Sequence, residues 1–267
     1  MVFDSGIGGL GVLAATRVRL SAAEFVFVAD DAGFPYGAWD EAPLVVRIVA
    51  LICELVDTFR PDVVVIACNT ASTLVLPALR AALKVPVVGT VPAIKPAAEH
   101  TKSGYVSVLA TPGTVKRDYT RALIEKFAAH VWVRLVGSDR LAEMAEAYVR
   151  GGEVDEAAVV EEIRPAFLER NGRRTDVVVL ACTHYPFLAP VFDKVAPWPV
   201  EFIDPAEAIA RRVEHVLGEA LGPRAARAAI PTAAPPMGVA IFTSGRRPEP
   251  DLERLLVSHG LKWAKIG

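Results

Sequence analysis

The sequence is poor in cysteine, in net charge and in signals that would direct it out of the cytoplasm. Its three cysteines, Cys53, Cys68 and Cys182, lie far apart and give no disulfide framework, which is typical of a reduced compartment. No signal-like segment precedes the residues VFDSG near the start of the chain. A formal net charge of only −2 leaves no general positive field for nucleic acid or anionic lipid. We therefore expect a cytoplasmic protein that binds neither nucleic acid nor a membrane.

The sequence also lacks a hydrophobic run long enough to cross a membrane. Its most apolar stretch, residues 42–56, is interrupted by Arg47 and Glu54 and falls short of the roughly 18 residues that a span requires. Apolar residues recur there at helical spacing, which predicts an amphipathic helix over 41–59. Cys53 lies in this segment and is interpreted as a small core residue. Because 52% of all residues are apolar, the chain can bury a substantial core.

Short β-branched segments alternate with helical patterns along the chain. The strand candidates are EFVFVAD, DVVVIAC, VPVVGTV, YVSVLAT, HVWVRLVG, DVVVLAC, VEFID and GVAIFTSG. The helix candidates besides 41–59 are residues 115–128, 139–150, 155–170 and 205–220, and residues 222–236 are interpreted as a surface connection. This alternation predicts an α/β fold in which helices cover parallel sheets.

Nearly the same phrase occurs twice, as DVVVIACNTAS at 62–72 and as DVVVLACTHYP at 176–186. In each copy an apolar strand candidate ends at a cysteine, Cys68 or Cys182, and polar residues that could cap a following helix come next. Ligands of α/β proteins collect at the carboxyl ends of strands, so two such ends could bring both thiols into one cleft. The alternative is a simple duplication in which each cysteine is only a small packing residue.

A glycine-rich segment near the start of the chain offers a competing interpretation. Residues 6–11 follow the pattern G-x-G-x-x-G, and Asp31 lies about 20 residues further on, as in nucleotide-dependent oxidoreductases that use nicotinamide or flavin. However, the preceding strand candidate is short, and the carboxylate of Asp4 would repel a pyrophosphate. The same glycines could instead form a tight turn whose backbone N–H groups bind a small carboxylate.

The residues alone also allow two other classes of protein. Four side chains could together bind zinc, namely Cys68, Cys182, His184 and Asp4. The short Cys/His spacings that are typical of zinc sites are absent from the sequence, which argues against this class. A module that binds an amino acid without converting it is the other class, and it would leave the configuration of the bound amino acid unchanged.

Five segments resemble, in order along the chain, the signature blocks of cofactor-independent glutamate racemases in the aspartate/glutamate racemase superfamily. They are VFDSGIGGL, FPYG, ACNTAS, ATPGTV and ACTHYP, and the resemblance covers residues 2–217. It implies two similar parallel-sheet α/β domains related by pseudo-twofold symmetry, with the active site in the cleft between them. The expected first domain comprises residues 1–92 and 205–267, and the expected second domain comprises residues 93–204.

The resemblance also implies the chemistry. Cys68 and Cys182 would act as two acid/base groups on opposite faces of the substrate Cα, Cys68 on D-glutamate and Cys182 on L-glutamate. A thiol has an ordinary pKa of about 8.5, so one of the two must be held as a thiolate while the other keeps its proton. Asp4 and His184 match the partners of the first and the second cysteine. The product, D-glutamate, would supply peptidoglycan and thereby cell-wall biogenesis.

The other expected site residues hold the polar groups of the amino acid. They are Ser5, Tyr36, Gly37, Asn69, Thr70, Thr114 and Thr183, with Glu146 as a further candidate near the cleft. Judged without the family, several of these residue types serve equally well as helix caps. The resemblance implies no cofactor and no metal, with glutamate as the small-molecule partner, and it leaves a homodimer open. Another member of the superfamily, acting on aspartate or a hydantoin, would use the same two thiols.

The chain departs from the family pattern in three places. Asp31 and Gly33 replace a threonine and an arginine that are common before PYG, which could alter the mouth of the cleft or the choice of substrate. The segment VGSDRLAEMAEA lacks the Cys-Pro step of many members, which affects the assignment of Glu146 most. The chain also begins almost at the first motif, without the N-terminal extension with which some members bind a peptidoglycan-precursor activator. We therefore expect no regulation of that kind.

Overall fold

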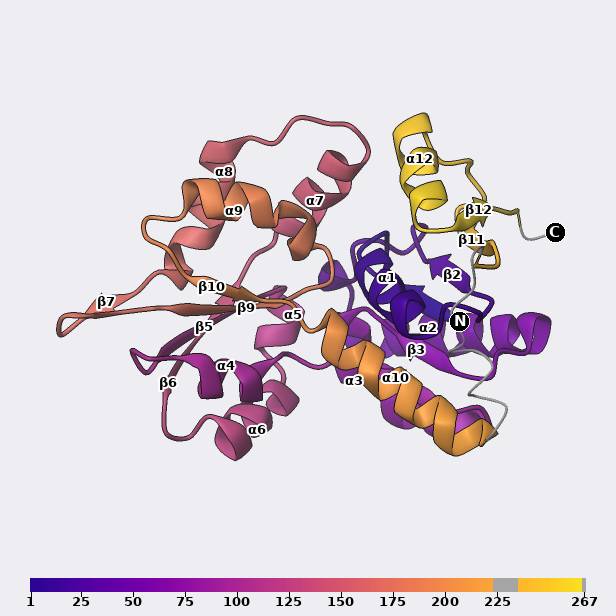
Figure 1. The fold of residues 1–267 in the computed structure, drawn as a ribbon, viewed down its shortest axis with the longest axis horizontal. Helices are drawn as coiled ribbons and strands as arrows, with labels where there is room; N and C mark the ends of the chain where they lie inside the picture. The colour runs from indigo at the N-terminus through magenta and orange to yellow at the C-terminus, as the bar shows by residue number, and fades with distance from the viewer. Residues whose placement is uncertain (223–234, 266–267) are drawn as a thin grey trace. The chain divides into compact units, whose positions relative to one another are not determined.

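A computed structural model describes residues 1–222 and 235–265 of the chain (Figure 1). The chain divides into two compact units, which we call unit 1 (Met1–Thr90 with Ala206–Gly267) and unit 2 (Val91–Pro205). The domain boundaries expected from the sequence, after residues 92 and 204, lie within two residues of this division. Most of the surface connection predicted at 222–236 lies outside the described residues. Within the described ranges, no helix combines the length and the apolar character needed to cross a membrane.

Unit 1 is built on a parallel sheet with the strand order β12-β11-β2-β1-β3-β4. The bounds are β1 (Val2–Asp4), β2 (Val26–Ala29), β3 (Val64–Ile66), β4 (Val87–Gly89), β11 (Gly238–Phe242) and β12 (Leu261–Trp263). The central strands β1 and β3 are buried at every position, as expected for a parallel sheet that is covered on both faces. Because the strands run in one direction, their carboxyl ends share one edge of the sheet.

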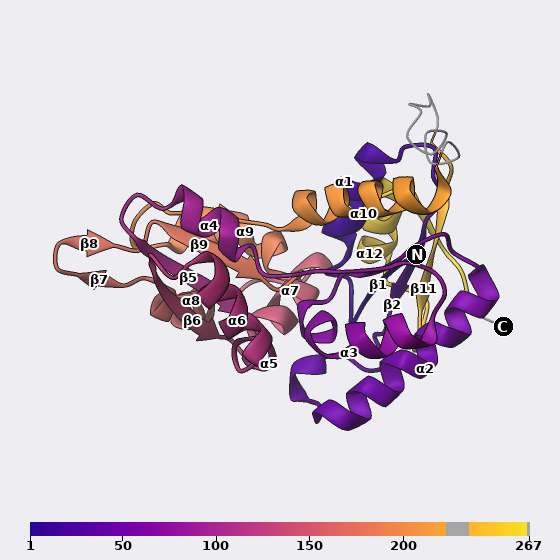
Figure 2. The same cartoon turned by 90° about the horizontal axis from the view of Figure 1, so that it is seen from below.

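Helices cover both faces of this sheet. Helix α1 (Leu10–Arg19) packs against α10 (Ala206–Leu221) on one face, together with α12 (Pro250–Ser258), while α2 (Glu41–Phe59) packs against α3 (Asn69–Ala82) on the other (Figure 2). The predicted amphipathic helix over 41–59 is confirmed by the bounds of α2. Its apolar stripe is buried because Leu44, Ile48 and Ile52 contact the core beside the sheet.

Unit 2 contains a second parallel sheet, in the order β10-β9-β5-β6. Its strands are β5 (Tyr105–Ala110), β6 (Trp132–Gly137), β9 (Val177–Ala181) and β10 (Glu201–Ile203). Helices α4 (Ile94–His100) and α6 (Asp118–Phe127) lie on one face, and α8 (Glu156–Ile163) and α9 (Ala189–Val195) lie on the other (Figure 1). Two short helices, α5 (Pro112–Val115) and α7 (Leu141–Val149), follow β5 and β6. The predicted α/β class is confirmed, since each unit is a helix-covered parallel sheet.

Two helices of unit 2 are shorter in the structure than the sequence predicts. The helix predicted over 155–170 ends at Ile163, because Pro165 cannot donate a backbone hydrogen bond, and a short antiparallel hairpin follows. This hairpin pairs β7 (Glu169–Arg170) with β8 (Arg173–Arg174), and its turn residues Asn171 and Gly172 both have positive φ. The segment predicted as one helix over 115–128 is instead divided between α5 and α6. Apolar spacing alone did not reveal these interruptions.

Candidate active site

Each unit gathers its expected site residues at the carboxyl edge of its own sheet. Unit 1 contains Asp4, Ser5, Tyr36, Gly37, Cys68, Asn69 and Thr70, and unit 2 contains Thr114, Glu146, Cys182, Thr183 and His184. Asp4 is the last residue of β1 and the others come after the end of a strand, and all of them except Gly37 in the short helix η1 (Tyr36–Ala38) are buried. This edge is where α/β folds place their ligands.

Asp4 and Cys68 lie at the ends of neighbouring strands in unit 1. Phe3 of β1 pairs with Ile66 of β3, so Asp4 ends one strand where Cys68 follows the other. Gly9 packs directly over this place: a Cβ on Gly9 would lie 2.9 Å from the Cβ of Asp4. A side chain there would displace the carboxylate, so a glycine is required by close packing.

The glycine-rich segment does not have the surroundings of a dinucleotide site. The buried carboxylate of Asp4 accepts a hydrogen bond from the backbone N–H of Gly6 at 3.0 Å, which places a negative charge on the amide that a pyrophosphate would need. The carboxylate of Asp31 accepts from the backbone and the hydroxyl of Ser244, at 2.8 and 2.5 Å. The Gly6 amide and the Asp31 carboxylate, which belong to the pattern that suggested a nucleotide-dependent oxidoreductase, are therefore already hydrogen-bonded within the protein.

Tyr36 lies in the same electrostatic environment as the thiol of unit 1. Its hydroxyl donates to Asp30 at 2.6 Å. Burial raises the pKa of Tyr36 above its ordinary value, and the negative charge of Asp30 raises it further. Cys68 and Asp4 add smaller contributions of the same sign to the pKa of Tyr36. These three groups are thus close enough to influence one another, and the phenol stays protonated.

Asn69 begins helix α3 directly after Cys68, but its side chain does not cap the helix. Its Oδ1 atom accepts from the hydroxyl of Thr90 at 3.3 Å. Among the residues that the structure describes, no partner is found for the Asn69 Nδ2 group, although Asn69 is only 2% exposed. A buried donor without a partner costs about 1–3 kcal/mol. This amide is therefore a group that a ligand could satisfy.

The thiol of unit 2 is followed by a chain of polar side chains. Cys182 comes after β9, and the ring atom Nδ1 of His184 lies 3.8 Å from its Sγ. On the other side of the ring, Nε2 lies 3.0 Å from Oε1 of Glu146 in helix α7. The Nε group of Arg150 donates to the second carboxylate oxygen, Oε2, at 3.2 Å. Cysteine, histidine, glutamate and arginine thus form one connected series.

This series determines which nitrogen of His184 can accept a proton. An ionised carboxylate only accepts hydrogen bonds, so the contact with Glu146 requires a proton on Nε2. In the neutral ring Nδ1 then carries a lone pair, and this atom lies beside Cys182. The arrangement can therefore draw the thiol proton onto His184 and leave a thiolate.

Thr114 and Tyr185 complete the surroundings of Cys182. Ala110 of β5 pairs with Ala181 of β9, so α5 begins beside the strand end that carries Cys182. Thr114 is fully buried in α5. Burial raises the pKa of Tyr185, and a thiolate at Cys182 adds to this rise. The tyrosine remains a neutral neighbour of the thiol.

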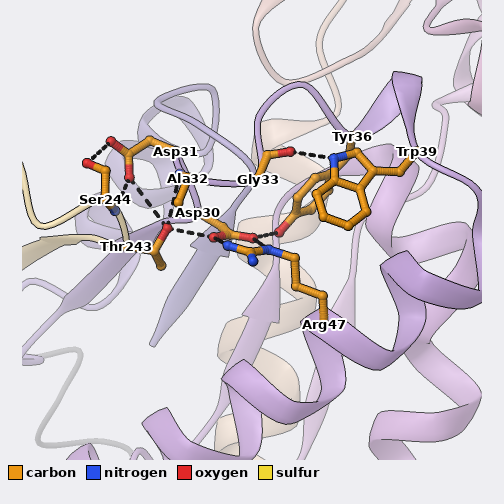
Figure 3. A network of polar contacts seen from close by, with 9 residues as sticks. All are labelled: Asp30, Asp31, Ala32, Gly33, Tyr36, Trp39, Arg47, Thr243 and Ser244. Carbon is orange, nitrogen blue, oxygen red and sulfur yellow. Dashed lines mark hydrogen bonds and ion pairs between the residues drawn. The ribbon is translucent and has the colours of Figure 1, made fainter.

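The sequence analysis missed two side chains that support these sites, Arg47 and Arg150. Arg47, in α2, forms two hydrogen bonds with Asp30 (Figure 3). A signal was present, since Arg47 lies between Leu44 and Ile48 on the buried stripe of that helix. A cation at such a position requires a buried anion, and Asp30, at the end of a strand candidate, was available. Arg150 gave the related signal of an acid and a base four residues apart.

The described residues contain no group of three or more His, Cys, Asp or Glu side chains arranged to hold a metal ion. All three cysteines, Cys53, Cys68 and Cys182, are present as thiols.

A model of the Asp/Glu/Hydantoin racemase family matches residues 15–213. The chain therefore belongs to this family, and it is an isomerase of the racemase class. The resemblance inferred from the five sequence segments is confirmed.

Individual relatives agree with this assignment over nearly the whole chain. Glutamate racemase from Brucella anthropi is 58% identical over 99% of this chain and 92% of its own length. The structure of Escherichia coli glutamate racemase in complex with L-glutamate and the activator UDP-MurNAc-ala is 37% identical, with a TM-score of 0.85 over 100% of this chain and 98% of that one. A glutamate racemase isoform from Bacillus anthracis is 25% identical, with a TM-score of 0.77 over 100% of this chain and 96% of that one.

Proposed function

We propose that the protein interconverts L-glutamate and D-glutamate by proton transfer at Cα, with Cys68 and Cys182 as the two acid/base groups. The observation that carries the proposal is the matched position of the two thiols, each following a buried strand at the carboxyl edge of its sheet. His184 lies beside Cys182, and Asp4 ends the strand that neighbours the one before Cys68. The names of the relatives from Brucella anthropi and Escherichia coli support glutamate as the substrate.

The proposed reaction needs no external electron acceptor. One thiolate removes the Cα proton, the electron pair stays on the substrate as a carbanion, and the opposite thiol delivers its proton to the other face. His184 receives the proton of Cys182 through Nδ1 when that thiol acts as the base, and Asp4 serves Cys68 in the same way. Cys68 acts on D-glutamate and Cys182 on L-glutamate. No cofactor or metal takes part in these steps.

Substrate binding is assigned to the remaining polar groups at the two strand edges. The Nδ2 group of Asn69 is buried and finds no partner among the described residues, which supports a role as donor to a substrate oxygen. Helix N-termini and hydroxyls supply further donors, from Ser5, Thr70, Thr114 and Thr183, while η1 contributes Tyr36 and Gly37. Oriented donors of this kind stabilise the charge that develops on the carboxylate as the proton leaves.

The proposed product places the protein in cell-wall biogenesis, where D-glutamate is supplied for peptidoglycan. The cytoplasm is the proposed location, because reducing conditions keep both thiols available. Glutamate is the proposed small-molecule partner, and a homodimer is the assembly to be tested by its mass in solution.

The reaction can be tested with L-glutamate in D2O, after exhaustive dialysis of the protein against a chelator and without added cofactor. Circular dichroism follows the loss of optical activity, and NMR or mass spectrometry follows deuterium at Cα. With two bases, newly formed D-glutamate carries solvent deuterium at Cα, while L-glutamate recovered early keeps most of its hydrogen. Aspartate is assayed in parallel, to compare the two acids as substrates.

Three outcomes would contradict the proposal. Early product that retains the substrate's hydrogen would indicate a single base. Activity that returns only with a metal or a nucleotide would indicate a cofactor. Faster turnover of aspartate than of glutamate would reassign the substrate within the same family.

A further inference from the structure

Asp30 is a fully buried carboxylate with three side-chain donors. Arg47 contacts both of its oxygens, with Nε to Oδ2 at 2.7 Å and Nη2 to Oδ1 at 2.6 Å. Thr243, which follows β11, donates to Oδ1 at 2.6 Å, and Tyr36 donates to Oδ2 at 2.6 Å (Figure 3). Both oxygens of Asp30 therefore hold donors from separate segments of unit 1.

The charge of Asp30 is stabilised by these contacts. Burial by itself would raise the pKa of this carboxyl, but the hydrogen bonds from Arg47, Thr243 and Tyr36 outweigh burial and hold the pKa below its ordinary value. Asp30 is therefore ionised at neutral pH, and its bidentate pair with a guanidinium is of the stronger, geometrically specific kind.

The segment that follows Asp30 depends on side chains for its shape. Residues 31–35 have no helix or strand, and η1 begins only at Tyr36. The indole Nε1 of Trp39 donates to the carbonyl of Gly33 at 2.9 Å, and the Arg47 guanidinium lies 5.7 Å from the centre of the Trp39 ring. Arg47 thus contacts Asp30, which precedes the segment that carries Tyr36 and Gly37, and Trp39, which ends it.

Gly33 leaves room for this arrangement. A Cβ at position 33 would lie 2.7 Å from Nε of Arg47 and 2.7 Å from Oδ2 of Asp30. Any longer side chain there would have to displace the ion pair. Gly33, noted in the sequence only as a departure from the family pattern, has a structural reason in this chain: it permits a guanidinium from α2 to reach Asp30.

We propose that Arg47 is a positioning residue for substrate binding: through Asp30 and Trp39 it fixes the turn at residues 33–39 so that Tyr36 and Gly37 meet the substrate beside Cys68. The inference rests on the proposed function for the role of Tyr36 and Gly37. Because the Tyr36 hydroxyl donates to Asp30, its place in the site is set by the Arg47–Asp30 pair.

The main test measures glutamate affinity without turnover. Glutamate bound beside Cys68 slows alkylation of that thiol, and the half-protecting concentration is read by mass spectrometry of the peptide that contains it. For R47M we expect this concentration and KM to rise about tenfold, with a smaller change in kcat, because the bidentate contact is lost. R47K keeps the positive charge but not the planar guanidinium that contacts both carboxylate oxygens. Its half-protecting concentration and KM are therefore expected to lie between those of R47M and the unchanged protein.

Arg19 provides a matched control. Its side chain is 30% exposed, against 31% for Arg47, and it forms an ion pair with Glu214 within the same unit. R19M removes a comparable cation away from the strand edge, so its half-protecting concentration and KM should stay within about twofold of the unchanged protein. Y36F, which removes the hydroxyl that donates to Asp30, should reproduce part of the R47M effect.

A second readout needs no substrate. The difference in fluorescence between the unchanged protein and W39F isolates the emission of Trp39, and R47M should shift it because the guanidinium leaves the ring. A folded R47M or R47K variant with unchanged Trp39 emission and unchanged half-protecting concentration would overturn the positioning role. Failure of glutamate to protect Cys68 in the unchanged protein would instead contradict the proposed function.

Discussion

The two units repeat a strand and a thiol, but they differ in what stands beside the thiol. In unit 1, Asp4 lies on the neighbouring strand end and accepts from a backbone amide, Gly6 N–H. In unit 2, His184 lies beside Cys182 and is backed by Glu146. A carboxylate is ionised near neutral pH by default, whereas an imidazole changes its charge near neutrality. The two units thus share a strand that is followed by a cysteine, and they differ in the side chain that the proposed mechanism uses as a proton acceptor.

Both units nevertheless place a carboxylate–guanidinium pair behind the site. Arg47 holds Asp30 in unit 1, and Arg150 contacts Glu146 in unit 2. The two pairs act on different groups, since Asp30 binds the hydroxyl of Tyr36 while Glu146 binds the ring of His184. We infer that unit 1 uses its pair to shape a binding turn and that unit 2 uses its pair to orient a proton acceptor.

The largest expected effect comes from replacing either thiol. C68S and C182S should each lower racemisation by about a thousandfold or more, because a hydroxyl is a far poorer base than a thiolate at neutral pH. The enantiomers have equal free energy, so kcat/KM must fall equally in both directions. Hydrogen exchange in D2O separates the units: C182S should exchange the Cα proton only of D-glutamate, and C68S only of L-glutamate. Exchange of the same enantiomer by both variants would contradict the assignment.

Replacing the proton acceptors should have the next largest effect. D4N and H184N each remove one acceptor and leave both thiols, and we expect a loss in kcat/KM of about a hundredfold. The assay is circular dichroism from both enantiomers, with thiol alkylation as a check that each site remains accessible. Activity within about threefold of the unchanged protein in H184N would show that Cys182 does not need the imidazole.

The Arg47–Asp30 ion pair of unit 1 should also contribute to the free energy of unfolding. R47M leaves Asp30 buried without its main partner, so we expect a loss of about 3 kcal/mol in the free energy of unfolding at pH 7. The pKa of Asp30 is depressed in the folded protein, so its stabilisation is present above the ordinary value of about 3.9 and is lost as the pH falls through the folded value. The difference in the free energy of unfolding between the unchanged protein and R47M should therefore decrease as the pH falls.

Urea unfolding at several pH values between 7 and 3 measures this difference. The difference in the free energy of unfolding should begin to decrease near the Asp30 pKa of R47M, which burial raises once Arg47 is absent. It should stop decreasing near the lower Asp30 pKa of the unchanged protein. R19M serves again as the control, since its ion pair is at the surface and is expected to contribute about 1 kcal/mol or less. A constant difference over this range would show that Asp30 does not carry the effect.

The sequence predicted the parts of the molecule that depend on local pattern. Short β-branched segments located the buried strands, and helical spacing located α2 with Leu44 and Ile48 inside. It failed where a single residue overrides the spacing, as Pro165 does at the end of α8. It also missed the Asp30–Arg47 pair, because contacts between distant side chains depend on how the helices pack on the sheet.

The support behind His184 should matter less than His184 itself. E146Q keeps the shape of the side chain and removes its charge, and we expect a loss in kcat/KM of about tenfold as the ring loses its fixed orientation. R150M leaves Glu146 in place, so a loss of about threefold or less is expected. The kcat/KM of the double variant E146Q/H184N, compared with that of H184N alone, completes the test. If E146Q has no further effect in an H184N background, Glu146 acts through the histidine; an equal loss there would contradict this route.

The smallest effect is expected from the third cysteine, which separates the chemistry of the repeated phrase from cysteine content in general. Cys53 lies on α2, half-buried and outside both strand edges. C53A removes a small apolar side chain, so we expect a loss of about 1 kcal/mol or less in stability and unchanged racemisation. Alkylation should still abolish activity in this variant, and glutamate should still protect it, because both site thiols remain. If C53A became resistant to alkylation, the sensitive thiol would be Cys53, and neither Cys68 nor Cys182 could be the reactive base.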